Sequence, residues 1–114
     1  MDERVRLNLL LDFYGELLNE HRRGVIDDYA CSDLSVSEIA KERGISRQAV
    51  HDLIKRCSAK LEAYEASMGL LERFLRIRRE AESIRDLIKK YREDGDSSHI
   101  ESIDSAAVRI IENL

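Results

Sequence analysis

The sequence has no proline and no tryptophan, and it has only five glycines among its 114 residues. Proline and glycine interrupt helices, so their scarcity favours long unbroken helices. Aromatic residues make up 5% of the chain. Because strands are enriched in aromatic and β-branched residues, this low content argues against a β-sandwich or β-barrel. We therefore expect an all-α fold.

Long apolar runs are also missing. The longest uninterrupted run, the leucines at 9–11, is far too short to span a membrane, and the first residues lack the apolar stretch and cleavage site of a signal peptide. We therefore expect a cytoplasmic protein. Cys31 and Cys57 are the only cysteines; they lack metal-ligand spacing, and a cytosolic pair is usually reduced. Cys57 falls on an apolar helical stripe, which predicts a small core residue.

Acidic residues outnumber basic ones, giving a net charge of −4, but the balance changes along the chain. Residues 35–60 carry six basic and three acidic side chains, and residues 61–92 carry eight and six. Residues 1–34 carry four and eight, and residues 93–114 carry one and six. Only the middle of the chain could therefore present a basic face to a polyanion. The acidic ends weigh against tight non-specific nucleic-acid binding, which depends on neutralising phosphates.

Apolar residues recur every three or four positions in six stretches, which predicts six helices. The stretches are roughly residues 5–19, 23–31, 36–43, 47–68, 70–91 and 100–114. Ser35, followed three residues later by Glu38, predicts a capping box at the start of the third helix. Gly44 and Gly69 predict the ends of the third and fourth helices, and residues 93–98 predict a turn.

Residues 36–56 have the pattern of a helix-turn-helix. A small residue, Ala40, stands where the two helices approach most closely, and Gly44, four residues on, permits the tight turn. Ile45 fills the core beside the turn, and Val50 and Leu53 hold the second helix against the first. Helical hairpins with no role in nucleic-acid binding can show the same pattern.

The second helix of this motif offers a polar outer face. Its candidate nucleic-acid-binding residues are Ser46, Arg47, Gln48, His51, Lys55 and Arg56. In helix-turn-helix proteins the start of this helix enters the major groove, where Gln48 could pair with adenine and Arg47 with guanine or a phosphate. Lys55 and Arg56 would contact the backbone. The alternative is an ordinary solvated helix face, and Asp52 in its middle would repel phosphate.

A heptad seam follows the motif. Its apolar residues are Leu70, Phe74, Ile77, Ala81, Ile84, Ile88 and Tyr91. The last predicted helix has a shorter apolar stripe, and two such helices joined by a short loop form an antiparallel hairpin. The shorter helix cannot cover the whole seam, which predicts a homodimer through these helices; packing on the N-terminal helices is the monomeric alternative. Basic residues between 73 and 92 alternate with acidic ones, which favours a salt-bridged surface over an RNA-binding strip.

Signals for catalysis are lacking. His21, His51 and His99 are scattered over different parts of the chain, which also has no glycine-rich phosphate loop and no paired metal-binding histidines. We therefore expect a binding module with no cofactor and no metal, and not an enzyme.

Four segments of the chain carry a more specific pattern. They are residues 11–14 (LDFY), 33–40 (DLSVSEIA), 45–56 (ISRQAVHDLIKR) and 61–65 (LEAYE). Together they resemble the YlxM family of small bacterial helix-turn-helix proteins over about residues 5–75, and the rest of the chain matches only in being helical and charged. The family's motif is similar to the promoter-reading C-terminal region of sigma factors, which implies a helix-turn-helix without a wing. The chain departs from the family at His51, where members usually have an aromatic residue such as tyrosine.

This resemblance implies a link to the signal recognition particle pathway, because the family's genes lie beside those of the particle's GTPase and receptor. The leading hypothesis is a regulatory helix-turn-helix protein that modulates the particle by binding its RNA or its GTPase. A sequence-specific DNA-binding transcription regulator and a protein-binding dimeric scaffold are the alternatives. The expected organisation is a helix-turn-helix domain over residues 1–68, followed by a helical hairpin or dimer bundle over residues 69–114.

Overall fold

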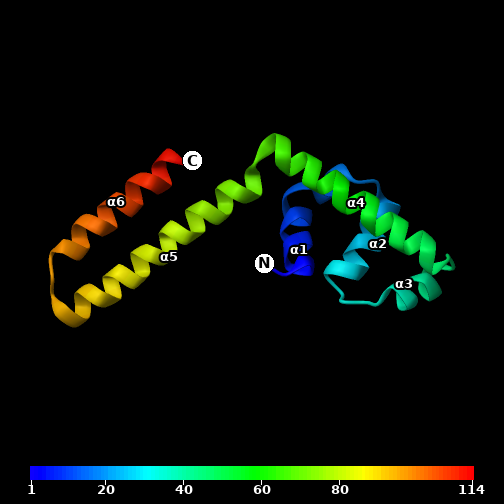
Figure 1. Ribbon diagram of the computed structural model, residues 1–114, viewed down its shortest axis with the longest axis horizontal. Helices are drawn as coiled ribbons and strands as arrows, with labels where there is room; N and C mark the ends of the chain where they lie inside the picture. The colour runs from blue at the N-terminus through cyan, green and yellow to red at the C-terminus, as the bar shows by residue number, and fades with distance from the viewer. The chain divides into compact units, whose positions relative to one another are not determined.

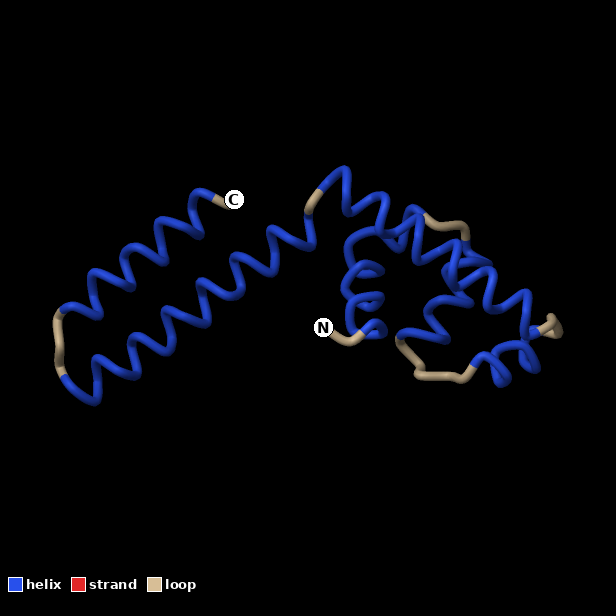
Figure 2. Tube along the Cα trace, in the orientation of Figure 1, coloured by secondary structure: helices blue, strands red, loops and turns tan.

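The computed structural model describes all 114 residues and is built from six α-helices and one short 3-10 turn, with no strand (Figures 1 and 2). In chain order the elements are α1 (Glu3–Tyr14), the 3-10 turn η1 (Gly15–Leu17), α2 (Glu20–Ala30), α3 (Val36–Arg43), α4 (Arg47–Met68), α5 (Leu70–Asp94) and α6 (Ser98–Glu112). The predicted all-α class is confirmed. The chain divides into two compact units, Met1–Gly69 and Leu70–Leu114.

The first unit is organised around the apolar face of α4. Val50, Ile54, Cys57 and Leu61 are buried at spacings of four, three and four residues, which keeps them on one side of the helix. The helices α1, α2 and α3 all pack against this side. Their buried contributions are Leu7, Leu10, Leu11, Tyr14, Val25, Ile26, Ala30, Ile39 and Ala40. Cys57 is therefore a core residue, as its place on the stripe predicts, and burial raises the pKa of its thiol.

Local sequence signals set the ends of α3 and α4. The Ser35 hydroxyl oxygen accepts from the backbone N–H of Glu38 at 3.1 Å, and the Glu38 carboxylate accepts from the N–H of Ser35 at 3.3 Å. This is the predicted capping box. Gly44 ends α3 with a left-handed φ of 65°, which glycine adopts without a steric penalty. The Ser46 hydroxyl oxygen then caps α4 by accepting from the N–H of Ala49 at 3.0 Å.

The boundary between the first two helices differs from the prediction. Instead of one helix over residues 5–19, α1 ends at Tyr14 and the short turn η1 follows it. The Asn19 side chain accepts from the N–H of Arg22 at 2.9 Å, so it starts α2 at Glu20, earlier than predicted. The leucines at 17 and 18 continue the helical spacing across this break, and their periodicity concealed it. Leu18 is buried, whereas Leu17 is 53% exposed.

Polar contacts between distant segments fasten the helices of the first unit. The Arg6 guanidinium donates to the Glu62 carboxylate at 2.6 and 2.8 Å, joining α1 to α4, and this hydrogen bond lowers the pKa of Glu62. The Tyr14 hydroxyl donates to Glu65 at 2.6 Å. Arg43, in the last turn of α3, pairs with Asp28 of α2 at 2.9 Å. These contacts hold the helix-turn-helix against the rest of the unit.

The second unit is an antiparallel hairpin of α5 and α6 (Figure 2). Arg109 of α6 pairs with Glu80 of α5 at 3.0 Å, and Ala106 is fully buried. Beyond its first turn α5 has no buried residue. The predicted turn is shorter than residues 93–98, because α5 continues to Asp94 and α6 begins at Ser98. The hairpin therefore has little core of its own.

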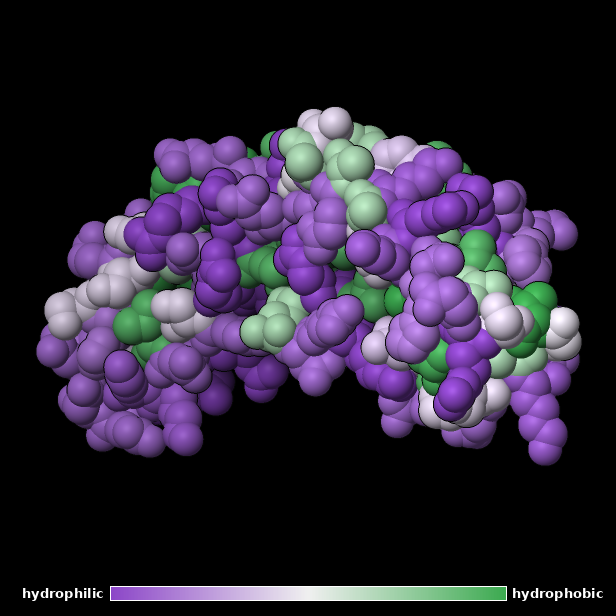
Figure 3. Space-filling view, turned by 45° about the vertical axis from the view of Figure 1, so that its right-hand side comes forward, coloured by the Kyte–Doolittle hydropathy of each residue, from purple (hydrophilic) through white to green (hydrophobic).

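The charged residues of α5 are only partly paired. Arg76 pairs with Glu72 and Arg78 pairs with Glu82, at 2.6 and 3.1 Å, both four residues apart. No ion pair engages the remaining basic residues of α5, which are Arg73, Arg79, Arg85, Lys89, Lys90 and Arg92. The salt-bridged surface expected from the sequence is thus present in the first half of α5, whereas the cations from Arg85 to Arg92 carry no ion pair. Figure 3 shows apolar surface (green) exposed between hydrophilic side chains.

Replacing Gly44 tests the turn on which the helix-turn-helix depends. Nothing lies within 4 Å of a Cβ placed at Gly44, so the cost of Gly44→Ala comes from the left-handed backbone alone. We expect this variant to lower the free energy of unfolding in urea by about 1–2 kcal/mol. Gly44→Asn is the control and should cost less, because asparagine tolerates this conformation. An alanine variant as stable as the native chain would contradict this role of Gly44.

Candidate nucleic-acid interface

The predicted binding residues lie at the start of α4, beside the start of α3. Arg47, Gln48 and His51 are exposed and line a shallow depression with Val36 and Ser37 of α3. An adjoining depression shares Val36, Gln48 and His51 with the first. It is completed by Glu3, Tyr29, Asp52, Ile54, Lys55 and Ser58. We call these two depressions together the α4 groove.

The structure separates the predicted residues into two sets. Arg47, Gln48, His51 and Lys55 line the α4 groove. Arg56 is exposed but lies outside it, because it follows Arg47 by nine residues, which is about half a turn around the helix. Ser46 contributes through its cap, which fixes the direction in which α4 starts. A ligand in the α4 groove would therefore meet four of the six predicted side chains directly.

The cations of α4 are available to a ligand, in contrast to most others in the first unit. Arg4, Arg6, Arg23 and Arg43 all carry ion pairs. No ion pair engages the basic residues of α4, which are Arg47, Lys55, Arg56 and Lys60. Intramolecular carboxylates therefore pair with four of the six cations elsewhere in the first unit and with none of those on α4.

Two acidic residues offset the positive charge of the α4 groove. Glu3 and Asp52 line it together with Arg47 and Lys55, so its formal charge is balanced. The Gln48 side-chain amide donates to the Asp52 carboxylate at 3.0 Å, one helical turn along. This bond occupies one of the two N–H groups of the Gln48 amide and restrains the direction in which the other can donate to a base. The site therefore suits a ligand that supplies specific contacts better than one held by charge alone.

The wall of the α4 groove includes residues that the sequence did not single out. Tyr29 of α2 lies at one side, and its position is fixed by Arg4, whose guanidinium carbon is 4.1 Å from the ring centroid. Arg4 also donates to the Tyr29 carbonyl oxygen at 2.9 Å and pairs with Asp33. The hydroxyl of Ser58 is buried without a hydrogen-bond partner. Sequence patterns gave no sign of these neighbours, because they come from separate helices.

Nothing in the structure resembles a metal centre. No three His, Cys, Asp or Glu side chains gather where they could hold an ion. That the protein needs no metal remains a prediction from the sequence. In the same way, none of the helices is long and apolar enough to cross a membrane.

Comparison with known proteins agrees with this geometry. The sequence model of the UPF0122 family, described as YlxM/p13-like helix-turn-helix proteins, matches residues 1–104. The chain belongs to this family. A UPF0122 protein of Clostridium kluyveri is 44% identical over 103 residues, which are 90% of this chain and 93% of the relative. One from Bacillus cereus strain AH187 is 37% identical over 114 residues, covering 100% of this chain and 98% of the relative.

The family likeness of this UPF0122 chain reaches further than the sequence pattern indicated. A relative in Shouchella clausii matches at 49% identity over 74 residues, 65% of this chain and 68% of its own length. The family match nevertheless continues to residue 104 and so includes most of the hairpin. The predicted limit at residue 75 was too short, because charge and apolar spacing alone do not distinguish one amphipathic helix from another.

Removing Asp52 tests whether its carboxylate weakens nucleic-acid binding in the α4 groove of this UPF0122 chain. Asp52→Ala removes a negative charge and releases the Gln48 amide. We expect affinity for RNA or DNA oligonucleotides, measured by fluorescence anisotropy at low salt, to rise about two- to threefold. Glu16→Ala removes the same charge from the turn η1 and should have a smaller effect. Equal effects of the two variants would show that net charge alone matters.

Proposed function

We propose that this chain is a regulatory binding protein, not an enzyme, and that it contacts nucleic acid through the α4 groove. The observation that carries the proposal is the capped start of α4, where Arg47, Gln48 and Lys55 are exposed and the two cations are unpaired. In helix-turn-helix proteins this part of the second helix makes the base contacts. The unit that presents it has a well-packed core, so the side chains start from a fixed backbone.

Each side chain has a role that follows from its chemistry. Arg47 and Gln48 stand in the first turn and would read base edges, because Arg47 can donate two hydrogen bonds to guanine and Gln48 can donate one and accept one with adenine. Lys55, two turns further along, would contact a phosphate. His51 lies between them in the α4 groove and could hydrogen-bond in either protonation state. Arg56, outside the groove, would at most touch a neighbouring strand.

We propose the signal recognition particle as the target, through its RNA or its GTPase, in the cytoplasm. The support is the resemblance of residues 45–56 to the YlxM motif, together with membership of a family described as YlxM/p13-like. The balanced charge of the α4 groove fits a structured partner, because an extended duplex would demand more phosphate neutralisation. This proposal concerns the partner and is separable from the binding face.

Sequence-specific DNA binding is the second candidate. It is favoured by the openness of the α4 face, whose residues 47, 48, 51 and 55 are all exposed and could enter a major groove. A dimeric scaffold in which the motif binds no nucleic acid is the third.

We also propose that the chain is a homodimer joined by its second unit. Of the heptad seam, Ala81, Ile88 and Tyr91 remain exposed on the hairpin, and Ile77 and Ile84 are only half-buried. A hairpin with so much apolar surface gains from a partner. Dimerisation would also present two α4 grooves to one ligand and so raise the affinity of a weak site.

The binding face is tested by removing its contacts one at a time. We expect Arg47→Ala and Gln48→Ala to relax sequence preference, each losing about 1–3 kcal/mol against the preferred sequence. Lys55→Ala should weaken binding to all sequences and reduce the slope of log affinity against log salt by about one. The control Arg56→Ala/Lys60→Ala removes two cations of α4 outside the groove. Identical losses in that control and in Arg47→Ala/Lys55→Ala would refute a role for the groove.

The partner is tested by capture from bacterial lysate with and without nuclease. Recovery of the particle's RNA or GTPase with the native chain, and its loss with Arg47→Ala/Gln48→Ala/Lys55→Ala, is the expected result. Capture of nuclease-sensitive DNA alone would support the transcription regulator. Recovery of neither nucleic acid nor that GTPase would favour the scaffold.

A further inference from the structure

One face of the hairpin carries apolar residues that neither of its two helices covers. Ala81 and Ile88 of α5 are exposed, Ile88 by 36%, and Ile100 and Ile111 of α6 are exposed by 48% and 68%. Ala107 is half-buried. We call Ala81, Ile88, Ile100 and Ala107 the hairpin stripe.

The hairpin stripe lies on one side of the hairpin. Glu80 faces α6 through its ion pair with Arg109, and Ala106 is buried where α6 meets α5. Ala81 follows Glu80, and Ala107 follows Ala106. A step of one residue along a helix is a rotation of about 100° around its axis. Both helices are right-handed and they run antiparallel, so equal rotations away from their shared contact lead to the same side. Ile88 and Ile100 are seven residues from Ala81 and Ala107 and share their faces.

The two halves of the hairpin stripe are also level with one another. The ion pair between Glu80 and Arg109 fixes the register of the helices. Because the helices are antiparallel, each step forward from Glu80 in α5 lies at the same height along the hairpin as one step back from Arg109 in α6. Ala81 is therefore within one residue of the height, or level, of Ala107. The same count brings Ile88 within one residue of the level of Ile100. The stripe thus consists of a small pair and a large pair, seven residues apart.

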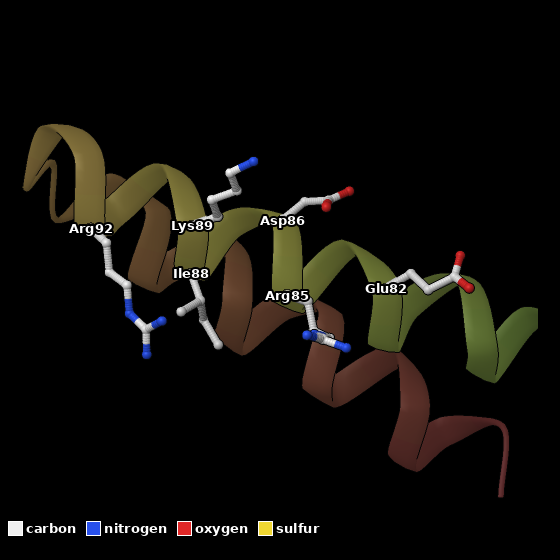
Figure 4. A pocket seen from close by; sticks show the side chains of 6 residues that line it. All are labelled: Glu82, Arg85, Asp86, Ile88, Lys89 and Arg92. Carbon is white, nitrogen blue, oxygen red and sulfur yellow. The ribbon is translucent and has the colours of Figure 1, made fainter.

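Opposite charges border the hairpin stripe on its two edges. Figure 4 shows Arg85, Ile88 and Arg92 projecting to one side of α5 and Glu82, Asp86 and Lys89 to another. Arg85 precedes Ile88 by three residues, and Asp104 precedes Ala107 by three. Each therefore lies about 60° beyond the stripe, on the edge away from the other helix. Both are exposed without an ion pair, and by the same count from Glu80 and Arg109 they are level.

Two symmetric ways of pairing these faces differ in their charge contacts. A two-fold axis across the helices would place α5 on α5 and Arg85 near a second Arg85. An axis parallel to the helices would place α5 on the partner's α6 and Arg85 near the partner's Asp104. Only the second arrangement makes both edges attractive. It also leaves positions along the helices unchanged, so residues that are level within a hairpin stay level between chains.

We propose that a second copy of this chain covers the hairpin stripe in this second arrangement, with α5 of each chain against α6 of the other. The proposal rests on the homodimer proposed above and adds its geometry. Ala81 packs on the partner's Ala107, Ile88 on the partner's Ile100, and Arg85 pairs with the partner's Asp104 at both edges. Closed two-fold dimers are the commonest assemblies of identical chains.

Cysteine cross-linking tests this geometry directly. Ala81→Cys and Ala107→Cys are made separately in a Cys31→Ser background, because Cys31 is exposed whereas Cys57 is buried. The two proteins are mixed, allowed to exchange and oxidised. We expect a disulfide between positions 81 and 107 of different chains, with little cross-linking of either variant alone. Ser105→Cys, exposed on α6 away from the stripe, is the matched control and should not link to position 81.

The outcomes separate the geometry from the dimer. Linkage of position 81 to position 81, in a chain that light scattering shows to be dimeric, would overturn the arrangement and leave the dimer standing. A mass near 13.2 kDa at micromolar concentration would overturn both. Loss of RNA or DNA binding in the groove variants would affect neither.

A charge exchange tests the two edges independently. Arg85→Glu gives a dimer acidic edges only, and Asp104→Arg gives it basic edges only, so each alone should weaken dimerisation about tenfold. Mixing the two variants should restore a heterodimer of native affinity. Helix content measured by circular dichroism confirms that both exposed substitutions leave the fold intact. If Arg85→Glu dimerises as tightly as the native chain, the proposed edge contact is wrong.

Discussion

The buried face of α4 is the constraint on which the first unit depends. Val50, Ile54, Cys57 and Leu61 hold α1, α2 and α3 against one side of a single helix. The groove residues alternate with this stripe: Gln48 and His51 flank Val50, and Lys55 follows Ile54. Any slip of the buried face would rotate the exposed one. The direction of the binding side chains is thus set by apolar packing, in which Val50 and Leu61 are fully buried.

The two units differ in how far they bury their apolar residues and pair their cations. The first concentrates its apolar residues inside and pairs Arg4, Arg6, Arg23 and Arg43 with carboxylates, whereas the cations of α4 carry no ion pair. The second has one fully buried residue in α6 and keeps unpaired cations along the second half of α5. A unit built in this way gains stability from association with another surface, whereas the first unit already contains its core.

Local signals in the sequence were sufficient for the helix-turn-helix. Ser35 with Glu38, Gly44, and Ser46 each act within four residues, and the capping box and the Gly44 turn are found as predicted. The break after Tyr14 was missed because apolar spacing continues through it. Tyr29 of α2 lines the groove beside residues of α4, and the ion pair between Arg43 and Asp28 joins α3 to α2. No pattern in a single sequence predicts such contacts between separate helices. The sequence also did not show which side of α5 faces α6, because the apolar residues of the heptad seam cover more of the helix surface than α6 contacts.

NMR mapping of the backbone amides during titration with RNA shows whether the ligand binds in the α4 groove. Binding there predicts shifts concentrated at Ser46–Lys55, at Val36 and Ser37, and at Tyr29, with the hairpin largely unaffected apart from dimer contacts. Shifts confined to α5 and α6, with α4 unchanged at saturating RNA, would contradict it.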